Sequence, residues 1–131
     1  MNSQAILGEG NYKYEIVENW EILPDKYKWP ETASVITDDQ DNVYVFNRGT
    51  HPMIVFDSDG NFIKSWGEDI FLRPHGLSQG PDNTIFCSDD GDHSVRQCDL
   101  DGNIIMTIGN PGSPSKPFSG EPFNRCTHTA V

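Results

Sequence analysis

The chain has 131 residues, enough for one domain with a buried core, and a hydrophobic fraction of 35% with many aromatic side chains favours a folded protein over a disordered acidic tail. Its formal net charge of −11 argues against nucleic acid as a partner, because phosphate backbones would be repelled. The acidity is compatible with cations, metals or basic peptides, or it only keeps the protein in solution. Twelve glycines and nine prolines indicate many turns and argue against long helices.

The first residues give no sign of secretion. Met1–Gly8 lacks a basic region followed by a long apolar run, so we do not expect a signal peptide. No stretch approaches the length of a membrane span, so a cytoplasmic protein without a membrane partner is the default expectation. Residues 1–11 are predicted to be a loose lead-in. From Tyr12 to Trp20 large apolar and polar side chains alternate over most of the length, which predicts a half-buried strand.

This outer strand and the loop after it occupy residues 12–29. A unit of short strands and turns then follows and occurs twice. The Gly-containing turn Asp57–Asn61 recurs 42 positions later as Asp99–Asn103. Each unit, residues 30–67 and 71–109, is predicted to hold four strands, the first rich in small residues. A repeat in the forties made of short strands and turns is typical of β-propeller blades.

The second unit also carries the remaining local signals. Asp89–Asp92 clusters carboxylates after a strand, where it could attract a cation, although a solvated hairpin tip is the favoured interpretation. Cys87 and Cys98 flank a hairpin and could form a bridge, but the three cysteines include no Cys-x-x-Cys pair, and reduced, partly buried thiols are favoured.

Residues 110–122, rich in Gly, Pro and Ser, are predicted to be a loop, and residues 123–131 the first strand of a third blade. Two blades and two further strands cannot close a propeller, which needs about four or more blades. The chain is therefore a fragment of a longer protein, a protomer that closes by association, or a smaller β-fold without a ring. We predict an all-β fold, an incomplete β-propeller, and expect a homo-oligomer or a partner protein that completes it.

Four runs carry a family resemblance: Val-Tyr-Val-Phe-x-Arg-Gly from Val43, Asp-x-Asp-Gly-Asn-Phe from Asp57, Arg-Pro-His-Gly-Leu from Arg73, and Asp-Asp-Gly-Asp-His from Asp89. The chain resembles the NHL-repeat propellers and, more narrowly, the branch related to the peptidyl-α-hydroxyglycine α-amidating lyases. The resemblance covers about residues 12–131 and corresponds to the N-terminal part of such a propeller.

The resemblance implies a zinc-dependent cleavage of C-terminal hydroxyglycine that leaves a peptide amide and glyoxylate. It implies that Arg48 stabilises charge on the substrate oxygen, that His75 is the first of three zinc ligands, and that the Leu77 carbonyl contacts a structural calcium. The family takes its other two zinc histidines and its catalytic tyrosine from later blades, which this sequence does not contain. His128 is one position away from the place equivalent to His75, so it is not assigned as a ligand.

Two functions follow from these residues. The leading one is a noncatalytic or vestigial propeller module that associates with itself or with a partner. The alternative is a metal-dependent lyase of the amidating type, active only if further blades are supplied. For Arg48 the competing interpretation is a salt bridge to a neighbouring carboxylate, and for His75 it is a single hydrogen bond to the backbone.

Overall fold

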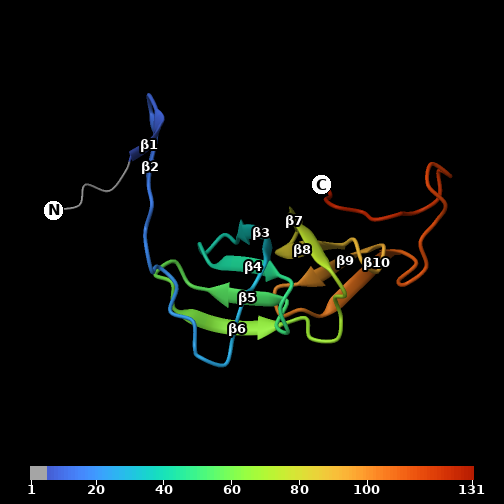
Figure 1. Cartoon of the computed structure of the whole chain (residues 1–131), viewed down its shortest axis with the longest axis horizontal. Coiled ribbons are helices and arrows are strands. Elements are labelled where there is room, and N and C mark those ends of the chain that lie inside the picture. The colour runs from blue at the N-terminus through green and yellow to red at the C-terminus, as the bar shows by residue number, and fades with distance from the viewer. Residues whose placement is uncertain (1–5) are drawn as a thin grey trace.

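Strands alone make up the regular structure of the residues described. The computed structural model describes residues 6–131, which form ten strands in three antiparallel sheets of two, four and four strands, none of them closed (Figure 1). The prediction of an all-β fold is confirmed. Within the described residues there is no helix of the length and hydrophobicity needed to cross a membrane. The expectation that Met1–Gly8 is not a signal peptide rests mostly on residues outside the described range.

The repeat forms two four-stranded sheets in which each strand pairs with the next along the chain. Their strands are β3 (Thr32–Thr37), β4 (Val43–Asn47), β5 (Met53–Phe56) and β6 (Phe62–Trp66), then β7 (Pro74–Gly80), β8 (Thr84–Asp89), β9 (Ser94–Asp99) and β10 (Ile104–Gly109). The register repeats with the sequence: Val43 pairs with Phe56, and 42 positions later Ile85 pairs with Cys98. The four strands predicted for each unit are therefore present.

The two sheets pack face to face, with β3 next to β7. The backbone N–H of Leu77 donates to Ser34 Oγ at 3.1 Å, and the side-chain amide of Gln79 donates to the carbonyl oxygen of Thr37. The core between the sheets contains Tyr44, Phe46, Met53, Val55 and Trp66 from the first sheet and Leu77, Ile85, Cys87 and Cys98 from the second. Removal of these apolar side chains from water, worth about 25 cal/mol per Å² of buried area, holds the sheets together.

The other face of sheet β3–β6 is covered by the chain that precedes it. Side chains from residues 20–29 pack over Val45, Ile54 and Phe56, and they are Trp20, Leu23, Tyr27 and Trp29. The indole rings of Trp20 and Trp29 lie 5.6 and 5.3 Å from the ring of Phe56. The central strands β4 and β5 are thus buried on both faces, while Val35 on β3 and Ile63 on β6 stay exposed.

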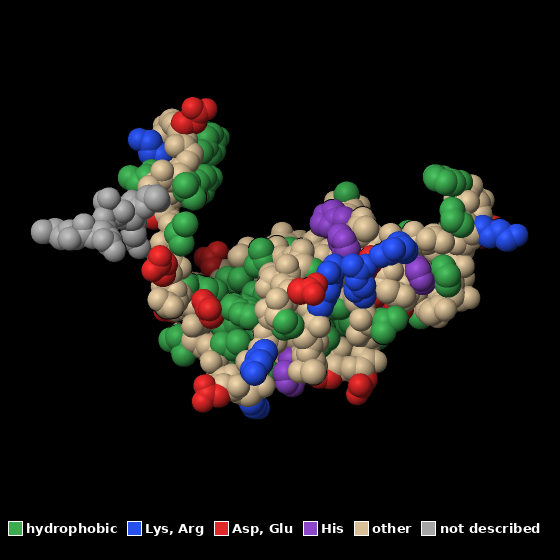
Figure 2. All heavy atoms as spheres, in the orientation of Figure 1, with side chains coloured by type: hydrophobic (Ala, Val, Ile, Leu, Met, Phe, Trp, Pro, Cys, Tyr) green, Lys and Arg blue, Asp and Glu red, His purple; other side chains and the backbone are tan. Residues whose placement is uncertain are grey.

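The N-terminal segment differs from the prediction. Strands β1 (Ile6–Glu9) and β2 (Tyr12–Glu15) form a hairpin that stands away from the sheets (Figure 1) and exposes apolar side chains (Figure 2). A loose lead-in is therefore wrong for residues 6–9. The strand predicted over Tyr12–Trp20 is present only over Tyr12–Glu15, and it is exposed instead of half-buried. Alternation predicted the strand, but no layer of the protein lies on either of its faces.

The last residues also differ from the prediction. No strand forms in residues 123–131, but Thr127 and Thr129 lie against β7. The Thr127 carbonyl oxygen is 3.0 Å from His75 Nδ1, and Thr129 Oγ1 is 2.8 Å from Ser78 Oγ. The segment takes the same place beside β7 that β7 takes beside β3. Within the described residues it joins no ladder of backbone hydrogen bonds.

Candidate functional site

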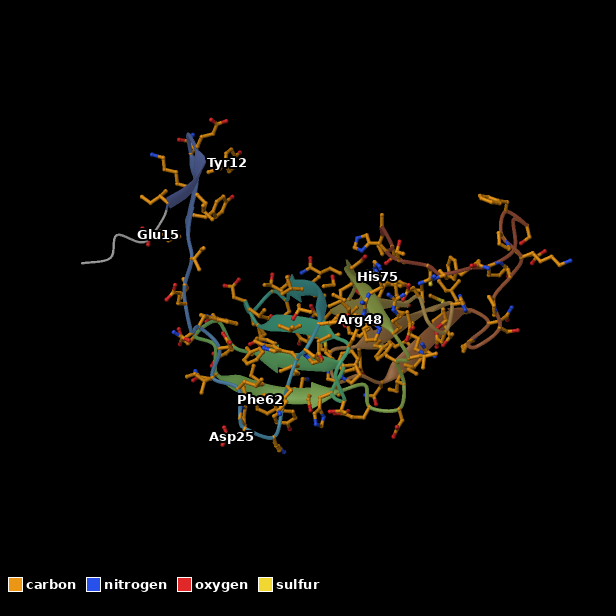
Figure 3. All side chains as sticks on the ribbon, in the orientation of Figure 1. Tyr12, Glu15, Asp25, Arg48, Phe62 and His75 are labelled. Carbon is orange, nitrogen blue, oxygen red and sulfur yellow. The ribbon has the colours of Figure 1, made fainter. Side chains whose placement is uncertain are left out.

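Arg48 and His75 come from different repeats but lie close together where β4 ends and β7 begins (Figure 3). Arg48 Nε donates to the carbonyl oxygen of Pro74 at 3.1 Å, and its Nη1 is 2.7 Å from Glu31 Oε2. The guanidinium therefore joins the two sheets and also makes the salt bridge that was the competing interpretation. One quarter of the Arg48 side chain, 26%, remains exposed, so it can still meet an anionic group.

His75 makes the backbone contact that was its competing interpretation. Because the Thr127 carbonyl can only accept, the ring donates from Nδ1 and leaves a lone pair on Nε2. That nitrogen is suited to a metal ion, but a catalytic zinc needs about three protein ligands. In residues 6–131 no three His, Cys, Asp or Glu side chains come together in a way that could hold a metal. The residues present therefore do not fit a catalytic zinc by themselves.

Leu77 belongs to a different environment. Its side chain is 2% exposed and lies in the core between the sheets, while its N–H is bonded to Ser34. Only its carbonyl oxygen could serve as the calcium contact that the resemblance implies, and Leu77 pairs in register with Cys87 within the sheet. The structure thus brings Arg48 and His75 together and puts the Leu77 side chain in the core, two residues further along β7.

A buried cluster of carboxylates lies near the start of β7, in the segment Asp89–Asp92 that was predicted to be a solvated hairpin tip. Asp89, Asp90 and Asp92 are all at most 7% exposed. Asp89 accepts hydrogen bonds from the backbone N–H groups of Leu72, Arg73, Gly91 and Asp92. The solvated-tip interpretation is therefore wrong, because these donors satisfy a carboxylate without water.

Arginines neutralise the other two carboxylates. Asp90 Oδ2 is 2.6 Å from Arg73 Nη1 and 3.2 Å from Arg125 Nη2, and Asp92 Oδ2 is 2.5 Å from Arg96 Nη2. One signal could have revealed the burial. Asp89 stands 42 positions after Asn47, which is also buried and binds the equivalent loop of the first repeat, with Oδ1 accepting from the N–H of Gly49.

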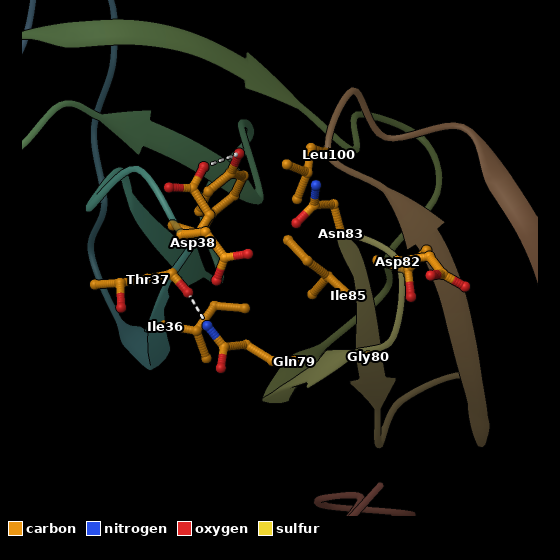
Figure 4. Close-up of a pocket in the computed structure, with 12 residues that line it drawn as sticks. Ile36, Thr37, Asp38, Gln79, Gly80, Asp82, Asn83, Ile85 and Leu100 are labelled. Atoms are coloured by element: carbon orange, nitrogen blue, oxygen red, sulfur yellow. Dashed lines mark hydrogen bonds between the residues drawn. The ribbon is translucent and has the colours of Figure 1, made fainter.

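A second candidate site was missed from the sequence. A cavity of about 340 Å³ opens between the sheets at the ends of β3 and β7, away from His75 (Figure 4). It is lined by Ile36, Thr37, Asp38, Asp39, Tyr44, Gln79, Gly80, Asp82, Asn83, Thr84, Ile85 and Leu100. No lysine, arginine or histidine is among them. A signal was present, since acidic residues stand in the turns after both inner strands.

The carboxylate of Asp38 is held in place at this cavity. It accepts from the N–H groups of Gln40 and Asn42, each at 2.9 Å, and from Tyr44 Oη at 3.2 Å. Burial raises the pKa of Asp38, but the hydrogen bonds from Asn42 and Gln40 outweigh it and leave that pKa below its ordinary value. Burial, together with the charge on Asp38, raises the pKa of Tyr44. At neutral pH Asp38 is therefore an anion and Tyr44 a neutral donor.

Compared with models of known protein families and with curated proteins, the chain gives no match. The NHL resemblance, the zinc and calcium ligands and the lyase activity therefore stay predictions.

Proposed function

We propose that the chain is a noncatalytic NHL-type propeller module that associates with a second copy or with a partner protein through one face of sheet β7–β10. We call this the far face, because it is turned away from sheet β3–β6. The register places on it Phe86, Ser88, Val95, Gln97, Met106 and Ile108. The core residues Ile85, Cys87 and Cys98 point to the opposite face.

The repeat itself supports this surface. The residues 42 positions before the far face are Tyr44, Phe46, Met53, Val55, Lys64 and Trp66. Five of these six side chains make up the face of the first sheet that packs against the second. The face of the first sheet that packs against a neighbouring sheet therefore has a counterpart in the second sheet, the far face. The last residues of the chain cover only part of this far face.

The uncovered part is β10. Met106 and Ile108 are 41% and 38% exposed, and the strand from Ile104 to Gly109 contains no charged residue. β10 is also the edge of its sheet, so one side of its backbone offers unpaired N–H and C=O groups. An apolar, uncharged edge strand of this kind favours pairing with another chain. The first sheet offers no such face, because residues 20–29 cover it.

Light scattering on the untagged chain tests this proposal. We expect a mass of at least two chains at about 100 μM, and the mass of one chain for the double variant Met106→Glu/Ile108→Glu. The control is Ile63→Glu, which places a charge on the edge strand of the other sheet at a side chain with a similar exposure of 46%. Circular dichroism confirms that each variant is folded. A wild-type chain that is strictly monomeric, or an Ile63→Glu variant that dissociates equally, contradicts association through the far face.

One observation favours the second function, a metal-dependent lyase resembling the amidating lyases and completed by further blades. Arg48 reaches the carbonyl oxygen of the residue before His75, and Nε2 of His75 keeps its lone pair. The test is zinc content after dialysis, together with glyoxylate release from a peptide ending in hydroxyglycine. Zinc that is lost in His75→Ala, with glyoxylate release lost in Arg48→Ala, supports the lyase. A metal-free, inactive chain supports the noncatalytic module.

A further inference from the structure

We propose that the cavity between the ends of β3 and β7 binds a protonated amine that carries an apolar group. Its volume of about 340 Å³ lies at the small end of the range for sites that hold small molecules. Ile36, Ile85 and Leu100 supply apolar wall, while carboxylates stand at the turns beside them (Figure 4). An apolar wall with one sign of charge at its edge suits a ligand that is apolar at one end and charged at the other.

The charge at the edge of the cavity is negative, and no lysine, arginine or histidine lines the cavity to neutralise it. Asp38 is ionised at neutral pH and is already bonded to its own turn. Asp39 and Asp82 are exposed, and within residues 6–131 neither makes a hydrogen bond or an ion pair. Lys64, which lines the neighbouring groove, is paired with Asp101. A cation that approaches the rim of the cavity therefore meets carboxylates without displacing an arginine or a lysine.

The walls are held in position before any ligand arrives. The Gln79 side chain joins the two inner strands through the Thr37 carbonyl, and Thr84 Oγ1 accepts from Gln97 Nε2 at 3.0 Å. Asp82 and Asn83 both have a φ of 56°, and the N–H of Thr84 donates to the Pro81 carbonyl at 3.2 Å. These are the features of a tight type I′ hairpin turn, which fixes where the two side chains stand. A rigid site loses little conformational entropy on binding.

An organic amine fits these residues better than a metal ion does. No three ligating side chains come together in the part of the chain that the structure describes, and three aliphatic side chains, Ile36, Ile85 and Leu100, line the cavity. A hard cation needs about six oxygen ligands, whereas an ammonium group on an apolar body needs only carboxylates beside a hydrophobic wall. Ammonium groups also occur in basic peptides, but the cavity is small, so we propose a small molecule as its ligand.

The probe is 2-phenylethylamine, with the neutral 2-phenylethanol as its uncharged analogue. Binding is followed at low salt by ¹H–¹⁵N NMR, because the side-chain amides of Gln79 and Asn83 line the cavity and report on it directly. We expect the amine to shift both amides, to bind about tenfold more tightly than the alcohol, and to weaken in 0.5 M NaCl.

The variant Asp39→Asn/Asp82→Asn removes the two unpaired carboxylates, and asparagine tolerates the left-handed φ at position 82. It should weaken amine binding about tenfold and leave alcohol binding unchanged. The control is Asp25→Asn, which removes one carboxylate from the loop over the opposite face of sheet β3–β6 (Figure 3). Equal binding of the amine and the alcohol, shifts away from Gln79 and Asn83, or equal weakening by Asp25→Asn would overturn the proposal. The outcome of this test does not depend on association through the far face, because the far face and the cavity lie on opposite sides of sheet β7–β10.

Discussion

Gly60 and Trp20 meet backbone to backbone: a Cβ atom on Gly60 would collide with the carbonyl oxygen of Trp20. The contact is reinforced on both sides, because the N–H of Ile22 donates to the Gly60 carbonyl at 2.7 Å and Trp20 Nε1 donates to the Ser58 carbonyl at 3.2 Å. This turn therefore fastens residues 20–29 over the first sheet, and the glycine serves the packing as well as its own φ of 84°.

Gly60→Ala should detach that segment. We expect a loss of about 2–3 kcal/mol in the free energy of unfolding, because the added methyl group must push the Trp20 backbone away in addition to straining the turn. Urea unfolding followed by tryptophan fluorescence measures it. Gly112→Ala is the matched control: its φ is 72°, but no atom lies within 4 Å of the added Cβ, so it should cost only about 1 kcal/mol. Equal losses for the two variants would show that the Trp20 contact contributes nothing.

The protein should lose stability in acid. The side-chain amides of Asn61 and Asn103 lower the pKa of Asp57 and of Asp99, so both carboxyls have folded-state pKa values below their unfolded ones. Groups of this kind stabilise the fold above the unfolded pKa, and this contribution is lost as the pH falls through the folded pKa. We expect the melting temperature to decrease as the pH is lowered below about 4. Asn61→Ala/Asn103→Ala should make that fall shallower, and an unchanged slope would count against the assignment.

The ion pair of Arg96 with Asp92 should be costly to break from one side. Both side chains are about nine-tenths buried, so Arg96→Met leaves a carboxylate without its partner in the interior. We expect a loss of about 3–5 kcal/mol in urea unfolding, with part of it recovered in Arg96→Met/Asp92→Asn. Lys64→Met serves as the comparison, because Lys64 pairs with an exposed Asp101 and should cost less than about 1 kcal/mol. A similar loss for both single variants would refute the role of burial.

Gly76→Ala should release the end of the chain without unfolding the sheets. A Cβ at residue 76 would collide with the carbonyl oxygen of Thr127 and with the ring of His128. Cys126 reports the release, because burial raises the pKa of its thiol while Cys87 and Cys98 are fully buried. We expect thiol labelling of the folded protein at pH 8 to accelerate about tenfold. Ser78→Ala, which removes only the bond to Thr129, should have a smaller effect, and an unchanged rate in Gly76→Ala would rule out this contact.

Part of the candidate site was visible in the sequence. The resemblance implied a role for Arg48 and for His75 in the same reaction, and the structure places Arg48 against the residue before His75. The Asp89–Asp92 segment was misjudged because its local sequence looks like any solvated turn. Arg73, Arg96 and Arg125 bury it, and no local pattern indicates that they meet it.

The cavity shows the same division. Asp39 and Asp82 each stand in an unremarkable hairpin turn, and only the stacking of the two sheets brings both to one opening. Likewise, alternation predicted a strand from Tyr12 but not its exposure, since exposure depends on whether another layer covers it.

By itself the sequence determined the number and order of the strands over residues 32–109. Those features follow from side-chain alternation and from turn residues, which act over a few positions. The same pattern repeats after 42 residues. Only the tertiary structure decided which sheet faces are covered, which carboxylates are buried and where a cavity opens. Burial is a property of segments that are distant in the chain, so it exists only once they have packed together.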